Sequence, residues 1–89
     1  MKSINISVFG KVQGVFFRAA TLRLAIELNL KGSVQNKSDG SVYIEAEGMD
    51  ENIEQFLSWC HTGPENSVIS HVEVQEKGFR NFSAFLLKQ

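Results

Sequence analysis

The chain has 89 residues, of which 43% are hydrophobic, and it carries a formal net charge of −1 and a single cysteine. This length predicts one domain over residues 1–89 with one core, and the lone Cys60 excludes an internal disulfide. The near-zero net charge disfavours nucleic acid and membrane as partners, and without a signal peptide or an apolar run of about 20 residues we expect a cytoplasmic protein.

Hydrophobic period distinguishes a first strand from a first helix. Residues 4–8 alternate apolar and polar side chains, which predicts a half-buried strand. Over residues 15–30 the period changes, and Leu22, Ala25 and Ile26 fall on one helical face. We therefore expect a helix that is buried over most of its circumference.

Two glycines mark the turns on either side of the second strand. Gly32 is expected to cap the C-terminal end of the helix, and the strand that follows ends near Asn36. Asp39-Gly40 lies between two β-prone segments and predicts a hairpin with a type I′ turn, in which both residues have positive φ. Residues 42–46 alternate again and form the third predicted strand.

A second helix and two more strands complete the chain. Asp50 is expected to be the N-cap of a helix whose apolar residues recur at helical spacing over 53–60. Residues 68–74 predict a fourth strand and residues 82–87 a short last one. The order β-α-β-β-α-β, with a short β added, is that of the ferredoxin-like split β-α-β sandwich, an α+β fold with an antiparallel sheet and two helices on one face.

A glycine-rich stretch, GKVQGVFFR at residues 10–18, joins the first strand to the first helix. Backbone N–H groups that enter a helix are unpaired, and together with the helix dipole they form a cradle for an anion. Gly14 permits left-handed backbone angles and the close approach of a ligand. Arg18 is unfavourably placed for the helix dipole, which suggests that it shares a bound phosphate-like anion with the amides.

The topology brings Asn36 to the same end of the sheet. The second strand runs parallel to the first, so its C-terminal end reaches the edge where residues 10–18 lie. If Val34 faces the helices, Asn36 faces them too, because side chains two residues apart share a face. A carboxamide needs partners in a core but not in a cleft, so we expect Asn36 and the glycine loop to face one hollow.

The residues alone leave several alternatives open. A Gly-x-x-x-Gly loop before an arginine is also typical of a tight β-α connection with a solvated side chain, and Phe16 and Phe17 are interpreted as core residues rather than ligand contacts. Thr21 could hydrogen-bond the loop or a substrate, or else its own helix. Cys60 and His61 are neighbours on a helix and point apart, which argues against a nucleophile–base pair. The histidines and the cysteine lack the spacing of zinc ligands, so no metal is expected.

Four segments resemble the acylphosphatase family: GKVQGVFFR at 10–18, SVQNKSDGSV at 33–42, TGP at 62–64 and FSAFLL at 82–87. The resemblance covers nearly the whole chain. It implies a single acylphosphatase-like domain, without a cofactor, that hydrolyses a small-molecule acyl phosphate to a carboxylate and inorganic phosphate. We expect it to act as a monomer.

The resemblance also implies which residues form the site. Arg18 and the loop amides would hold the phosphoryl group, and Asn36 would position the attacking water. The phosphate-binding loop of the family is matched by five consecutive residues, Gln13, Gly14, Val15, Phe16 and Phe17.

The chain departs from the family pattern at two places. Ser33 stands where a bulky aromatic residue is usual, and residues 86–89 lack the common basic or aromatic ending. We expect neither departure to touch Arg18 or Asn36.

A hydrolase of this kind has modest chemical needs. The leaving carboxylate has a pKa near ~4, so it can depart without a general acid. The competing hypothesis is a binding module, namely a non-hydrolysing anion-binding or regulatory domain of ferredoxin-like fold. RNA binding is less favoured, because it requires basic surface with exposed aromatic residues, whereas Glu45 and Glu47 lie beside Tyr43.

Overall fold

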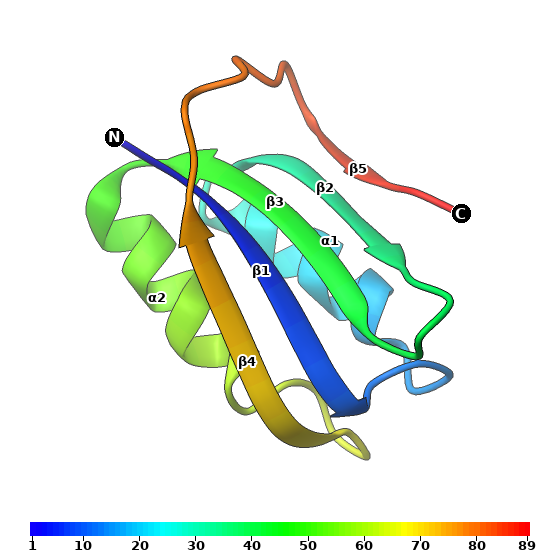
Figure 1. The fold of residues 1–89 in the computed structure, drawn as a ribbon. Coiled ribbons are helices and arrows are strands. Elements are labelled where there is room, and N and C mark those ends of the chain that lie inside the picture. Colours follow the sequence, from blue (N-terminus) through cyan, green and yellow to red (C-terminus); the bar gives the residue numbers. More distant parts are fainter.

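A computed structural model describes residues 1–89 as one five-stranded sheet with two helices behind it (Figure 1). The elements are β1 (Lys2–Lys11), α1 (Phe17–Glu27), β2 (Lys31–Asn36), β3 (Val42–Gly48), α2 (Asp50–Cys60), β4 (Val68–Glu76) and β5 (Phe85–Leu87). The strand order is β4-β1-β3-β2-β5. Strands β1 to β4 pair antiparallel, which confirms the predicted fold, and β5 adds a parallel pairing with β2 that makes the sheet mixed.

The core lies between the helices and one face of the sheet. Alternate residues of β1 and β3 point into it, and Ile6 opposite Ile44 is fully buried. On the helix side, every fourth residue of α1 and the apolar face of α2 cover these strands; the buried residues of the two helices are Phe17, Thr21, Ala25, Ile53, Phe56 and Cys60. Neither helix has the length and hydropathy that crossing a bilayer requires.

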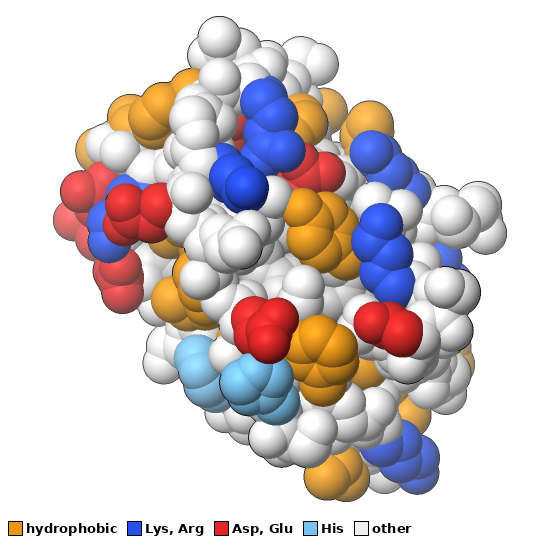
Figure 2. Space-filling model, viewed as in Figure 1, with side chains coloured by type: hydrophobic (Ala, Val, Ile, Leu, Met, Phe, Trp, Pro, Cys, Tyr) orange, Lys and Arg blue, Asp and Glu red, His pale blue; other side chains and the backbone are white.

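The opposite face of the sheet faces outward and is mostly polar, with a few hydrophobic side chains among the charged ones (Figure 2). Acidic and basic side chains are interspersed over it. Asn5 and Glu45, which are register partners on β1 and β3, both bond Arg80 from the β4–β5 connection (residues 77–84). The period-2 pattern of the sequence therefore separates an apolar inner face from a polar outer one.

Glu47 fastens the β4–β5 connection to the outer face. Glu47 is only 5% exposed, and its carboxylate accepts hydrogen bonds from the backbone N–H of Arg80 (2.6 Å) and of Phe82 (3.2 Å). The Ser3 hydroxyl donates a third (3.2 Å). These contacts fix the path by which the chain crosses the sheet from β4 to the opposite edge at β5 (Figure 1).

The first helix differs from prediction at its end and on one face. It stops at Glu27, and Asn29, with φ 60°, takes the left-handed position that we assigned to Gly32. Gly32 lies within β2, where a Cβ atom would come 1.8 Å from the Glu45 carbonyl oxygen, so its role is close approach of two strands. Ile26 is 62% exposed, because the buried face of α1 is the narrow stripe of Phe17, Thr21 and Ala25, and Ile26 lies beside it.

Two predicted turns also differ in detail. Asp39 has negative φ and only Gly40 is left-handed, so the hairpin turn is not type I′. The Asp39 carboxylate instead accepts hydrogen bonds from the Ser41 hydroxyl (2.6 Å) and backbone N–H (2.9 Å), and these hold the pKa of Asp39 below its usual value. Asp50 is the first residue of α2 rather than its N-cap, which is Met49.

Candidate functional site

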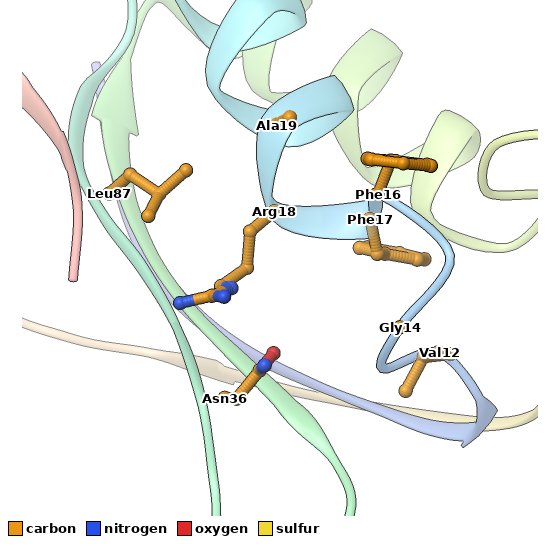
Figure 3. Close-up of a pocket in the computed structure, with 8 residues that line it drawn as sticks. All are labelled: Val12, Gly14, Phe16, Phe17, Arg18, Ala19, Asn36 and Leu87. Carbon is orange, nitrogen blue, oxygen red and sulfur yellow. The ribbon is translucent and has the colours of Figure 1, made fainter. Parts of the chain in front are cut away.

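A cavity of about 290 Å³ opens where β1 passes into α1 (Figure 3). Its walls come from the loop after β1, the first turn of α1, the end of β2 and the last residue of β5. The lining residues are Val12, Gly14, Phe16, Phe17, Arg18, Ala19, Asn36 and Leu87. The hollow that the topology predicted, with Asn36 and the glycine loop on its walls, is therefore present.

The backbone of the loop has several unused donors, and two of the residues that carry them, Gly14 and Phe16, line the cavity. No N–H group of residues 13–16 donates a hydrogen bond within the protein. The N-cap position of α1 is Phe16, whose side chain accepts no bond, so the first helical turn is uncapped as well. Gly14 (φ 75°) and Phe16 (φ 62°) are left-handed while Val15 between them is not, an alternation typical of anion-binding backbone nests.

Arg18 extends from the first turn of α1 into the cavity (Figure 3). Its guanidinium donates to the backbone carbonyl of Lys88 (2.9 Å) and pairs with no carboxylate. A cation at a helix N-terminus without a counter-ion leaves uncompensated positive charge beside the free amides. The contact with Lys88 corrects our expectation that the C-terminal residues do not touch Arg18.

Asn36 faces the same space from the end of β2 (Figure 3). Its carboxamide oxygen is buried and has no hydrogen-bonding partner within the protein. Val34, two residues earlier, is fully buried in the core, so the face parity of the strand is as predicted. A buried acceptor without a donor carries a desolvation cost, and a polar guest in the cavity would relieve it.

Three other loop residues, Gln13, Phe16 and Phe17, differ in their contacts and in their burial. Gln13 does not line the cavity, and its amide donates to the carbonyls of Lys37 (2.8 Å) and Ser41 (2.9 Å), which ties the loop to the β2–β3 hairpin. Phe17 is buried, with its ring centroid 5.4 Å from that of Trp59, as a core residue should be. Phe16 is 85% exposed, so its interpretation as a core residue is wrong.

Three further side chains that were candidates from the sequence, those of Thr21, Cys60 and His61, do not line the cavity. The Thr21 hydroxyl is fully buried and makes no hydrogen bond, either to the loop or to its own helix. Burial raises the pKa of the Cys60 thiol to about 12. The His61 ring bonds the Leu57 carbonyl of its own helix (3.0 Å). No group of three or more His, Cys, Asp or Glu side chains is arranged to hold a metal ion.

The structure adds residues that sequence reasoning did not assign to the site. Leu87 and Ala19 line the cavity, and Lys88 bonds Arg18. Strand β5 brings two of these residues there, because its parallel pairing with β2 places residues 85–87 alongside residues 32–34. The only available signal was the FSAFLL segment near the C-terminus, which predicted a strand but not its partner.

Comparison with known proteins points to one family. The family model described as Acylphosphatase matches residues 4–86. An acylphosphatase of Thermotoga petrophila is 42% identical over 88 residues, which cover 99% of this chain and 98% of the relative. The crystal structure of acylphosphatase from Bacillus subtilis superposes with a TM-score of 0.96 at 31% identity and full coverage of both chains. An acylphosphatase structure from Coxiella burnetii gives 0.94 at 37% identity, covering 98% of this chain and 92% of that one.

The family model spans almost the entire chain, the relatives align with it end to end, and two solved structures are nearly superposable on it. The chain therefore belongs to the acylphosphatase family of hydrolases.

Proposed function

We propose that this protein hydrolyses the carboxyl–phosphate bond of small acyl phosphates, releasing a carboxylate and inorganic phosphate, in the cavity shared by Arg18 and Asn36. One observation carries the proposal. A single hollow of about 290 Å³ is lined by Arg18, which has no carboxylate partner, and by Asn36, whose carboxamide oxygen is buried without a donor. Gly14 and Phe16, whose backbone N–H groups are unbonded, line it as well.

The positive elements of the site suit a phosphoryl group. Three equatorial oxygens share the negative charge in phosphoryl transfer, and catalysis rests mainly on positioning and on charge stabilisation. Arg18 presents a planar fork that fits phosphate oxygens, and the amides of residues 14–18 supply further donors without a counter-ion. Lys88 holds the guanidinium through its backbone carbonyl and so limits the rotamers that Arg18 samples before substrate arrives.

Asn36 fits the role of positioning the attacking water. Its unpartnered oxygen can accept a hydrogen bond from that water and so aim a lone pair at phosphorus. The leaving group is a carboxylate, whose pKa near ~4 lets it depart unprotonated. The proton of the water passes to a phosphate oxygen in this scheme, so no carboxylic acid or histidine is needed at the cavity.

Two substitutions separate the two roles. With purified protein and benzoyl phosphate, we expect Arg18→Gln to abolish both turnover and the binding of inorganic phosphate. Asn36→Ala is expected to abolish turnover while phosphate binding, measured by calorimetry, stays close to that of the unmodified protein. Asn52→Ala is the matched control, because Asn52 lies in the first turn of α2 at the opposite end of the sheet. Normal turnover by Asn36→Ala would refute the water-positioning role.

The same assay decides between hydrolase and binding module. Turnover of acetyl or benzoyl phosphate supports the enzyme. A protein that binds inorganic phosphate through Arg18 but turns over neither substrate is the non-hydrolysing anion-binding domain of the alternative hypothesis. The monomeric state, the lack of a cofactor and the cytoplasmic location that we expect from the sequence stay predictions.

A further inference from the structure

A second cavity, of about 330 Å³, adjoins the first across the start of α1. Phe16 and Ala19 line both cavities, so these two residues form the wall between them. The remaining lining residues of the second cavity are Val15, Ala20, Arg23, Pro64, Glu65 and Asn66. Val15 belongs to the phosphate-binding loop, whereas the others come from α1 and from the turn after α2, which the proposed phosphoryl site does not use beyond the first helical turn.

Phe16 is the unusual residue of this wall. Its side chain is 85% exposed, and its backbone is left-handed, a conformation that bulky residues seldom adopt. In Figure 3 the ring extends from the start of α1 away from Asn36 and from the Arg18 guanidinium. Neither burial nor backbone preference explains an aromatic side chain here, and a strained residue beside a site is reason to look for a ligand contact.

The direction of the reaction links the two cavities, provided that the proposed function holds. In phosphoryl transfer the attacking and leaving oxygens lie roughly in line on opposite sides of phosphorus. A water held by Asn36 on β2 therefore directs the acyl group toward the α1 side of the cavity. That side is formed by Phe16 and Ala19 (Figure 3), beyond which the second cavity begins.

We propose that the second cavity is the acyl subsite and that it favours uncharged aromatic acyl groups. Four of its eight lining residues are hydrophobic, and these are Val15, Phe16, Ala19 and Ala20, the side of the cavity next to the first one. Arg23 and Glu65 are its charged residues, and because they carry opposite signs they select for neither an anionic nor a cationic acyl group. The exposed ring of Phe16 offers a benzoyl group a stacking partner at the edge of this open hollow.

The test compares benzoyl phosphate with acetyl phosphate, whose methyl group is too small to reach across the wall. For Phe16→Ala we expect the ratio of kcat/KM for benzoyl over acetyl phosphate to fall about three- to tenfold, the range that loss of one aromatic contact gives. The change should lie in the KM for benzoyl phosphate. Phe16→Gly should lower the ratio equally, and because glycine suits the left-handed backbone this variant keeps the fold.

The outcomes separate the subsite from the hydrolase itself. Phe79→Ala removes another exposed phenylalanine, on the β4–β5 connection, and should keep the unmodified ratio. If both Phe16 variants keep that ratio, the acyl subsite is wrong even though the hydrolase is right. If a Phe16 variant disturbs the phosphate loop in general, kcat/KM falls equally for both substrates and their ratio stays unchanged. That result counts against the subsite. Hydrolysis of neither substrate by the unmodified protein refutes the proposed function and the subsite with it.

Discussion

Glu47→Gln tests whether one buried carboxylate holds the β4–β5 connection in place. The substitution keeps the shape of the side chain but replaces one carboxylate oxygen by an amide NH₂ group. In the unmodified protein one carboxylate oxygen of Glu47 accepts hydrogen bonds from both Arg80 and Ser3, and the other accepts one from Phe82. In glutamine the remaining oxygen can keep the first pair, whereas the NH₂ group faces the N–H of Phe82, donor against donor.

The expected cost follows from these bonds. Loss of one hydrogen bond to a charged acceptor, together with the loss of charge assistance in the other two, should lower the free energy of unfolding by about 2–4 kcal/mol. For a domain of this size each kcal/mol shifts the Tm by about 4–8 °C. A stability of roughly 5–15 kcal/mol is ordinary for such a domain, so the loss is a large fraction of the total.

Urea denaturation measures this change directly. The single tryptophan, Trp59, packs against Phe17 and Phe56 in the core and provides a fluorescence signal of unfolding. Glu76→Gln is the matched control, because the Glu76 carboxylate is exposed and makes no hydrogen bond or ion pair; we expect a change within about 0.5 kcal/mol. If Glu47→Gln falls within the same range, the carboxylate does not fasten the connection and the reasoning is refuted.

Two further predictions concern buried groups of the helices. Thr21→Val should raise the free energy of unfolding by about 1 kcal/mol, because the Thr21 hydroxyl is buried without a partner and valine has nearly the same shape; destabilisation in the same urea titration would mean that the hydroxyl has a partner after all. The Cys60 thiol, buried and with its pKa raised to about 12, should resist a thiol reagent at neutral pH in the native protein and react fully in denaturant. Rapid labelling of the native protein would contradict the burial of Cys60.

The order of the elements could be predicted because each one carries its own local pattern. Strand β1 alternates in polarity with period 2, and the glycine loop marks where the chain turns into α1. The position of Asn36 was within reach for the same reason, since strand parity relates it to the buried Val34. Local pattern and topology together were enough to bring Asn36 and Arg18 into one cavity.

The exposure of Phe16 was missed although the sequence held a signal for it. The buried stripe of α1 runs through Phe17, Thr21 and Ala25, at spacings of four residues. Tracing that stripe backward from Ala25 reaches Phe17, and a helix continued by one residue would place Phe16 about 100° away from it. Hydrophobicity alone treats the two phenylalanines alike, whereas helical phase distinguishes them.

The contact between Lys88 and Arg18 could not be predicted in this way. It depends on the parallel pairing of β5 with β2, and β5 has only three residues, too few to show a period. Its register follows from backbone bonds such as that from the Lys88 N–H to the Val34 carbonyl (2.8 Å), which join residues far apart in sequence. Non-local pairing of this kind is decided by the assembled sheet.

The carbonyl that anchors Arg18 belongs to Lys88, and Leu87 before it lines the cavity, so a segment joined after Gln89 starts beside the cavity mouth. The amino group of Met1 pairs with exposed Asp50 (2.9 Å) at the far end of the sheet (Figure 1). A purification tag or fusion partner behind Gln89 would crowd the guanidinium and obstruct the entrance. Attached ahead of Met1, it would disturb only a solvent-exposed ion pair, and that is the arrangement to choose for kinetic work.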